Sequence, residues 1–176
     1  MQSPSCSIRQ LCGNDSALMH GLLDMFGKAF NEEDTFGAQR PSDAYLRQLL
    51  DGDIFVALAA LKAGQVVGGL AAYELKKFEQ VRSELYIYDL AVDEAHRREG
   101  IATALIEEAR RIAAKRGAYL VFIQADVRDG PAVALYETLG ERLVVYRDRW
   151  ALIAQFRKYR STLSDPVALR MMLSMS

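Results

Sequence analysis

Apolar residues in the first third of the chain recur mainly with the spacing of amphipathic helices. Leu18 and Phe26 belong to one such helix, and Asn14 or Asp15 precedes it with a side chain suited to a helix cap. The other elements predicted here are a short strand at residues 7–11 and a second helix that follows Ser42 and ends at residues 51–53, with a charged stretch at residues 31–35 between the two helices.

The rest of the chain has the pattern of a β-sheet interleaved with helices. Apolar runs at residues 54–61 and 66–75 are separated by Lys62-Ala63-Gly64, which is typical of a hairpin turn. The elements predicted after them are a strand at residues 83–92, a long amphipathic helix that ends near Gly117, a strand at residues 119–125, a helix from Pro131 to Gly140, and a last strand at residues 143–146.

This order of elements predicts a mixed α/β fold with one core. No repeat or linker interrupts it, so residues 1–148 are expected to form a single domain. Residues 149–176 carry five basic side chains, one acidic side chain and three of the six methionines, and we assign them to a C-terminal extension of unknown role. An extra helix, a partner-binding arm and a cloning remnant all remain open for this extension.

Composition excludes several classes of protein. Hydrophobic residues make up 51% of the chain, yet no run reaches the roughly 18 apolar residues of a membrane span. The formal net charge of −1 lacks the basic excess of a general nucleic-acid-binding protein. Cys6 and Cys12 are too few for a disulfide scaffold, and no spacing of Cys and His predicts a metal site. The N-terminus does not have the pattern of a secretory signal, so a cytoplasmic protein is expected.

The segment from Tyr88 to Ala102 carries the clearest chemical signal. A strand is predicted to end at residue 92, and a polar turn leads into a helix near Gly100. A helix N-terminus offers unpaired N–H groups and the positive end of the helix dipole, which together favour phosphate. Arg97 and Arg98 add positive charge, and glycine lets a ligand approach the backbone. We therefore predict a cradle for a diphosphate that is neither a Walker loop nor a Rossmann fingerprint.

Two sequence blocks resemble the GNAT superfamily of acyl-CoA-dependent N-acetyltransferases. Arg97-x-x-Gly100-x-Ala102 is similar to the pyrophosphate motif of that family, and residues 132–140, AVALYETLG, are similar to its later helix block. The resemblance covers residues 5 to 148. The chain departs from it at Asp129, where the family often has Asn, and at Glu141, where the family has an aromatic residue. The first departure puts one polar contact to the cofactor in doubt, and the second affects only packing.

A closer resemblance links the chain to the type I aminoglycoside 3-N-acetyltransferases. It rests on residues 55–60, 69–73, 77–80, 82–92 and 124–126. This resemblance implies transfer of an acetyl group from acetyl-CoA to the 3-amino group of a 2-deoxystreptamine aminoglycoside, by direct attack in a ternary complex, and hence antibiotic resistance. By analogy with the family, a homodimer is also expected.

The resemblance implies a fold and a set of cofactor contacts. The fold is a mixed, mostly antiparallel central sheet, flanked by helices and splayed at the acetyl-CoA site, although an ordinary buried strand at residues 85–92 is the alternative. The cofactor, with no metal, is expected to contact Leu90, Ala91, Val92, Arg97, Arg98, Gly100, Ile101, Ala102, Thr103, Asp129 and Ala132.

Tyr136 and several carboxylates are the candidate catalytic groups. The family places at the position of Tyr136 the tyrosine that protonates the departing thiolate, while core packing is the alternative role. Glu84, Asp89 and Asp126 lie at strand positions that border the expected acceptor cleft. Glu84 and Asp126 are the first candidates for the base, although the carboxylates could merely bind ammonium groups, or water could carry that proton instead. The candidate contacts for a cationic acceptor are Glu32, Glu33, Asp34, Glu84, Tyr86, Asp89 and Asp126.

The charge distribution agrees with a cationic acceptor. Residues 26–94 hold 7 basic and 12 acidic side chains, so the deficit of positive charge lies on the expected acceptor side. Residues 32–34 would then act as a lid over the acceptor, or form only a solvated acidic loop. Two other functions stay open: a GNAT enzyme that acetylates a polyamine or a protein N-terminus, and a non-catalytic acyl-CoA-binding module.

Overall fold

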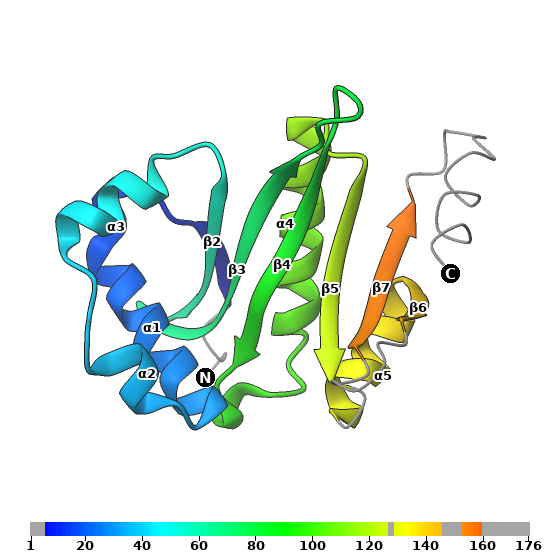
Figure 1. The fold of residues 1–176 in the computed structure, drawn as a ribbon. Helices are drawn as coiled ribbons and strands as arrows, with labels where there is room; N and C mark the ends of the chain where they lie inside the picture. Colours follow the sequence, from blue (N-terminus) through cyan, green and yellow to red (C-terminus); the bar gives the residue numbers. More distant parts are fainter. Residues whose placement is uncertain (1–5, 127–128, 146–152, 160–176) are drawn as a thin grey trace.

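A seven-stranded sheet in the order β1-β2-β3-β4-β5-β7-β6 runs through the part of the chain that the structure describes (Figure 1). The structure is a computed structural model that describes residues 6–126, 129–145 and 153–159, with side chains for residues 6–125 and 129–140. All neighbouring strands are antiparallel except β4 and β5, which are parallel. The strands are β1 (Ser7–Gln10), β2 (Phe55–Lys62), β3 (Gln65–Lys76), β4 (Ser83–Val92), β5 (Leu120–Asp126), β6 (Glu141–Val145) and β7 (Ile153–Tyr159).

Helices cover both faces of the sheet. The first three α-helices pack on one face, and α4 lies across the opposite face (Figure 1). The helices are η1 (Gly13–Asp15), α1 (Ser16–Phe30), α2 (Glu33–Gly37), α3 (Asp43–Leu50), η2 (Glu94–His96), α4 (Ile101–Arg116) and α5 (Gly130–Leu139).

The helix ends follow from local chemistry. The Ser42 hydroxyl accepts a hydrogen bond from the Tyr45 N–H and starts α3. The carboxylate of Asp129 accepts one from the Ala132 N–H at the start of α5. Gly117, with φ 78°, ends α4 in the left-handed conformation that glycine adopts without strain. These caps fix where each helix meets the sheet.

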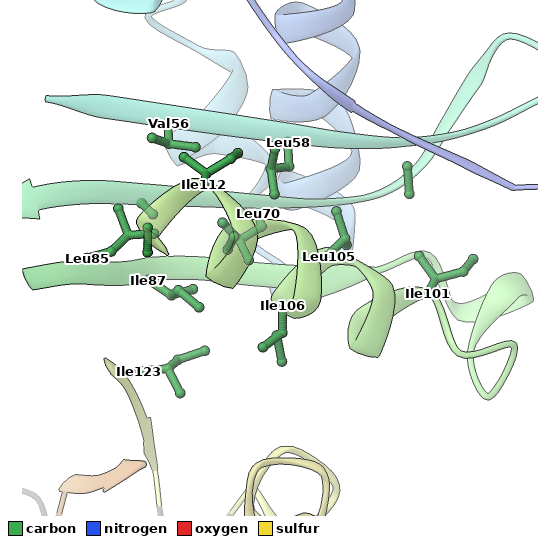
Figure 2. Close-up of a cluster of buried hydrophobic side chains, with 14 of the residues drawn as sticks. Val56, Leu58, Leu70, Leu85, Ile87, Ile101, Leu105, Ile106, Ile112 and Ile123 are labelled. Carbon is green, nitrogen blue, oxygen red and sulfur yellow. The ribbon is translucent and has the colours of Figure 1, made fainter. Parts of the chain in front are cut away.

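Each face of the sheet has its own apolar core. Figure 2 shows the core under α4, where Ile112 lies beside Val56 of β2 and Leu105 belongs to the same cluster as Leu70 and Leu85. The opposite core joins α1 and α3 to β2 and β3 and includes the fully buried Leu22. Because strand side chains alternate between faces, successive residues of β2 and β3 serve the two cores in turn.

A glycine pair in β3 brings α1 and α4 close to the sheet at the same level. A Cβ atom at Gly69 would lie 2.0 Å from Leu22 Cδ1 of α1 and 3.0 Å from the Leu58 carbonyl oxygen. A Cβ atom at Gly68 would lie 3.1 Å from Ile101 Cγ2 at the start of α4. The two helices therefore approach the backbone from opposite faces, next to the end of β4.

The fold class predicted from the sequence is confirmed: the sheet is mixed, mostly antiparallel and flanked by helices. The pattern did not predict α2, which lies in the charged stretch. It also assigned residues 153–159 to the C-terminal extension, whereas the structure places them as β7 between β5 and β6. The boundary at residue 148 stays a prediction, and most of the extension lies outside the described residues.

The close approach of α1 gives a stability prediction. We expect Gly69→Ala to lower the free energy of unfolding by about 1–3 kcal/mol, because the new methyl group overpacks the site against the fully buried Leu22. Gly37→Ala is the matched control, since a Cβ atom there has no neighbour within 4 Å, and its effect should stay within about 0.5 kcal/mol. Urea denaturation measures both variants, and equal effects would contradict the close approach.

Candidate active site

β4 and β5 pair over only part of their lengths. Their parallel pairing runs from Glu84 opposite Leu120 to Ile87 opposite Ile123, although both strands continue beyond these residues. Figure 1 shows the lower ends of the two strands moving apart, with α4 behind them. The sheet is therefore splayed where β4 ends, as the sequence analysis expected.

One extra residue in β4 accompanies this divergence. Ile87 lies opposite Ala72 of β3 and Asp89 lies opposite Ala71, so Tyr88 has no counterpart there. Such a bulge bends its strand and increases the local twist. The last four residues of β4 consequently stay paired with β3 and turn away from β5.

The hydrogen-bond register shows which backbone groups face the gap between β4 and β5. The Asp93 N–H donates to the Val67 carbonyl at 2.9 Å and therefore points toward β3. Because backbone groups alternate along an antiparallel strand, those of Ala91 also point toward β3. The N–H and C=O groups of Leu90 and Val92 point the other way, into the gap.

The turn that follows β4 exposes the start of α4. Arg98 and Gly100 both have positive φ angles, 64° and 78°, and α4 begins at Ile101. The first N–H groups of α4 have no acceptor within the helix and lie at the positive end of its dipole. No atom lies within 4 Å of a Cβ position at Gly100, so the approach to these groups is open. With the exposed side chains of Arg97 and Arg98 beside it, this end of α4 can hold a diphosphate.

A groove of about 920 Å³ joins this turn to the strand gap. The start of α5 forms its second wall, and the end of α1 closes it with Ala29 and Phe30. All eleven residues predicted to bind the cofactor line it: Leu90, Ala91, Val92, Arg97, Arg98, Gly100, Ile101, Ala102, Thr103, Asp129 and Ala132.

Tyr136 of α5 also lines this groove, although its side chain is only 6% exposed. Burial, and secondarily the charge of Asp129, raise the pKa of the Tyr136 hydroxyl well above its ordinary value. The phenol therefore stays protonated at neutral pH, as a proton donor must.

Acidic and aromatic groups meet on the face of the sheet that carries α1 and α2. Asp89 is half-buried beside the bulge, and burial followed by the negative charge of Glu32 raises the pKa of its carboxyl. Tyr86 donates a hydrogen bond to Gln124 at 3.1 Å, and its ring contacts that of Tyr88.

The predicted acidic stretch lies at the start of α2. Glu32 occupies the N-cap position, and Glu33 and Asp34 form the first turn, all three exposed. Phe36 of α2 packs against Phe30 of α1, a residue that lines the groove. Within this stretch, Glu32 is the residue whose negative charge raises the pKa of Asp89.

Glu84 is not brought together with the other candidates. It lies at the start of β4, six residues before Leu90 and hence about 20 Å from it along the strand. Its carboxylate accepts a hydrogen bond from the Tyr119 hydroxyl and lies 3.5 Å from the Lys77 ammonium. These partners give it a structural role at the far end of the sheet. Asp126 is the last residue of β5, and its side chain lies outside the described residues.

Several groove residues were not selected from the sequence. Phe30 and Leu135 belong to apolar helix faces, and His96 belongs to a polar turn. None of these patterns differs from ordinary packing or solvation, so no sequence signal separated them. Tyr73, which contacts Tyr88, was noticed only as part of a resemblance.

Two further features, a metal site and a membrane-spanning helix, are absent from the described residues. Residues 6–126, 129–145 and 153–159 contain no group of three His, Cys, Asp or Glu side chains arranged to hold a metal ion. No helix in this part of the chain has the length and apolar character needed to cross a bilayer.

Comparison with known proteins identifies the family to which this geometry corresponds. The model of the acetyltransferase (GNAT) family matches residues 20–140. The structure of an aminoglycoside acetyltransferase from an uncultured soil metagenomic sample is 57% identical, with a TM-score of 0.79, over 83% of this chain and 97% of that one. A second aminoglycoside acetyltransferase from such a sample, in complex with sisomicin, is 30% identical, with a TM-score of 0.72, over 82% and 95% of the two chains.

Curated relatives match over shorter regions. The ribosomal protein bS18 alanine N-acetyltransferase of Escherichia coli strain K12 is 32% identical over 73 residues, which are 42% of this chain and 48% of that protein. The chain spans about a third to a half of the length of the curated relatives it matches. These relatives are all N-acetyltransferases, so they support N-acetyl transfer as the reaction class. They do not point to one acceptor.

Proposed function

The chain belongs to the acetyltransferase (GNAT) family and is an acetyl-CoA-dependent N-acetyltransferase, and from this premise we propose that it acetylates the 3-amino group of 2-deoxystreptamine aminoglycosides. The observation that carries the proposal is the half-buried Asp89 at the splayed end of β4, where the acetyl-CoA groove approaches an acidic and aromatic face. The similarity to two aminoglycoside acetyltransferases supports the same acceptor class.

The size of the groove and its hydrogen-bond donors support acetyl-CoA as its ligand. The open N-terminus of α4, with Arg97 and Arg98, would hold the pyrophosphate. The gap-facing C=O of Leu90 and the N–H and C=O of Val92 would pair with the amide groups of the pantetheine arm, as a neighbouring strand would. Acetyl-CoA supplies the acetyl group as a thioester.

The residues around the strand gap divide the chemistry between them. Asp89 accepts the proton that the acceptor ammonium loses, which frees the nitrogen lone pair to form the new C–N bond. The Leu90 N–H faces the carbonyl oxygen and stabilises its developing negative charge. Tyr136 donates its proton to the sulfur as the C–S bond breaks, so the thiol leaves neutral. The nitrogen loses its second proton as the amide forms, and that proton returns the Tyr136 phenolate to its neutral form. The acceptor face adjoins the groove, so both substrates are held together and proximity contributes without a covalent enzyme intermediate.

This assignment places the base at Asp89, which the sequence analysis ranks behind Glu84 and Asp126. The side chain of Asp126 lies outside the described residues, so its role stays a prediction. Glu84 already has a hydrogen bond from Tyr119 and an ammonium neighbour. The carboxyl of Asp89 has a raised pKa, so its carboxylate is more basic than that of an ordinary aspartate. Glu32, Glu33, Asp34 and Tyr86 remain proposed contacts of the cationic acceptor, and resistance to aminoglycosides would follow from their acetylation. The homodimer and the cytoplasmic location stay predictions.

An acceptor panel tests the function directly. Acetyl-CoA consumption is measured with gentamicin, an aminoglycoside blocked at its 3-amine, spermidine and a peptide with N-terminal alanine. We expect turnover with gentamicin and its loss when the 3-amine is blocked. Turnover with the peptide alone would favour the activity of the bS18 relative. If acetyl-CoA is not consumed with any of the amines, a non-catalytic binding module would be favoured.

Replacement of Tyr136 separates proton donation from binding. We expect Tyr136→Phe to lower kcat about 10²-fold to 10⁴-fold, because phenylalanine fills the same space but cannot protonate the thiolate. The Kd for acetyl-CoA, measured by calorimetry, should stay within about twofold, since the ring packing is retained. Unchanged turnover would contradict the role of Tyr136 as the acid.

The raised pKa of Asp89 predicts the acid limb of the pH–rate profile. As the pH falls through this pKa, Asp89 becomes protonated and kcat/KM should fall. Asp89→Asn should lower kcat about 10²-fold to 10⁴-fold. Glu32→Gln should move the limb to lower pH, because the charge of Glu32 helps to hold the pKa of Asp89 above its ordinary value.

The matched control is Glu108→Gln, whose carboxylate pairs with Arg111 on α4. This variant should keep the wild-type profile. A limb that belonged to the substrate amine would stay in place in Glu32→Gln, and that result would remove Asp89 as the base.

A further inference from the structure

A row of aromatic rings crosses the acceptor face of the sheet from β2 to β5. Phe55 and Tyr73 have ring centroids 5.2 Å apart, and Tyr73 and Tyr88 have centroids 5.8 Å apart. Tyr88 contacts Tyr86 at 5.8 Å, and Tyr86 stacks on Phe122 at 4.7 Å. Four neighbouring strands thus contribute to one continuous row of aromatic contacts.

The middle of this row lies beside the proposed base. Tyr88 is 62% exposed although it is the bulged residue next to Asp89. Tyr73 contacts Tyr88, the neighbour of Asp89 in the chain, and lines the same pocket as Tyr45. Tyr73 therefore connects the reaction centre to the surface around Tyr45.

A second pocket opens at the β2 end of the row. It has a volume of about 340 Å³ and lies between α3 and the β2–β3 pair. Tyr45 and Ile54, at its rim, are 56% and 50% exposed, although both are large apolar side chains. Its lining residues are Tyr45, Gln48, Leu49, Gly52, Asp53, Ile54, Phe55 and Tyr73.

The lining of this pocket has the two properties that an aminosugar ring requires. Its aromatic and aliphatic walls can cover the C–H face of a sugar and attract an ammonium group through the ring quadrupole. The side chain of Gln48 provides an oxygen acceptor. The carboxylate of Asp53 accepts a hydrogen bond from the Lys76 ammonium at 3.0 Å and keeps a second oxygen for a ligand. The pocket shares Phe55 and Tyr73 with the aromatic row, so a ring bound there lies next to a ring whose amine faces Asp89.

We propose, on the basis of the proposed function, that the pocket between Tyr45 and Tyr73 is a second acceptor subsite that holds an aminosugar ring linked to the reacting 2-deoxystreptamine ring. The reaction itself involves only the ring at Asp89. The subsite thus selects multi-ring aminoglycosides over single-ring amines, and it does so through binding rather than through the chemical step.

The experiment compares two acceptors that present the same 3-amine: gentamicin, with three rings, and 2-deoxystreptamine, with one. Tyr45→Ala should lower kcat/KM for gentamicin about 2-fold to 30-fold, the effect of one lost cation–π contact. The loss should appear in KM with kcat retained. The value for 2-deoxystreptamine should not change, because this acceptor does not reach the pocket.

A gain of affinity provides a second test that does not depend on damage to the fold. Gln48→Glu adds a carboxylate at an exposed position of the pocket and should lower KM for gentamicin alone. Phe78→Ala is the matched control, because Phe78 is a fully exposed aromatic residue between β3 and β4, outside the pocket. It should leave both acceptors unaffected.

The outcomes separate the subsite from the function. Equal losses on both acceptors in Tyr45→Ala, or no loss on either, would overturn the subsite while gentamicin turnover by the wild type still supported the proposed function. If the wild type acetylates neither acceptor, the proposed function itself fails and the subsite fails with it.

Discussion

Two helices, α1 and α4, pack closely against the same two residues of β3 from opposite faces of the sheet, and the rest of the site depends on this constraint. Gly69 admits Leu22 of α1 on one face, and Gly68 admits Ile101 of α4 on the other. Gly68 pairs with Val92 at the end of β4. The start of α4 is therefore fixed against the last paired residues of β4. Because the turn between them is short, the first N–H groups of α4 lie beside the strand gap.

The bulge at Tyr88 turns this fixed end into a site with two sides. Before the bulge, β4 pairs with β5, and after it the backbone groups of Leu90 and Val92 face the gap. The extra residue also places Asp89 beside Tyr88 on the face that carries Glu32 and the aromatic row. One inserted residue thus separates a backbone edge suited to an extended amide chain from a carboxylate suited to an amine.

Sequence reasoning succeeded where a local pattern determines local geometry. The glycine and arginines before α4 predict an open, positively charged helix start, which the structure has, and every predicted cofactor residue lines one groove. That this helix start binds a diphosphate stays a prediction. It failed where the outcome depends on long-range register. Glu84 and Asp89 lie on the same predicted strand, but only the pairing of β4 with β3 and β5 shows that Glu84 is at the far end. A helix in the acidic stretch could not be predicted because it depends on Phe36 packing against α1.

Although the net charge of the chain is close to zero, one carboxylate, Glu32, changes the pKa of another, Asp89. Burial raises the pKa of Asp89, and Glu32 raises it further by repulsion between like charges. The same charge attracts a cationic acceptor. Once bound, ammonium groups near Glu32 would offset its charge and lower the pKa of Asp89 again, so the base would be more basic in the free enzyme than in the complex. The pH dependence of kcat/KM, which reports the free enzyme, should then differ from that of kcat, and this difference distinguishes a polycationic acceptor from a monoamine.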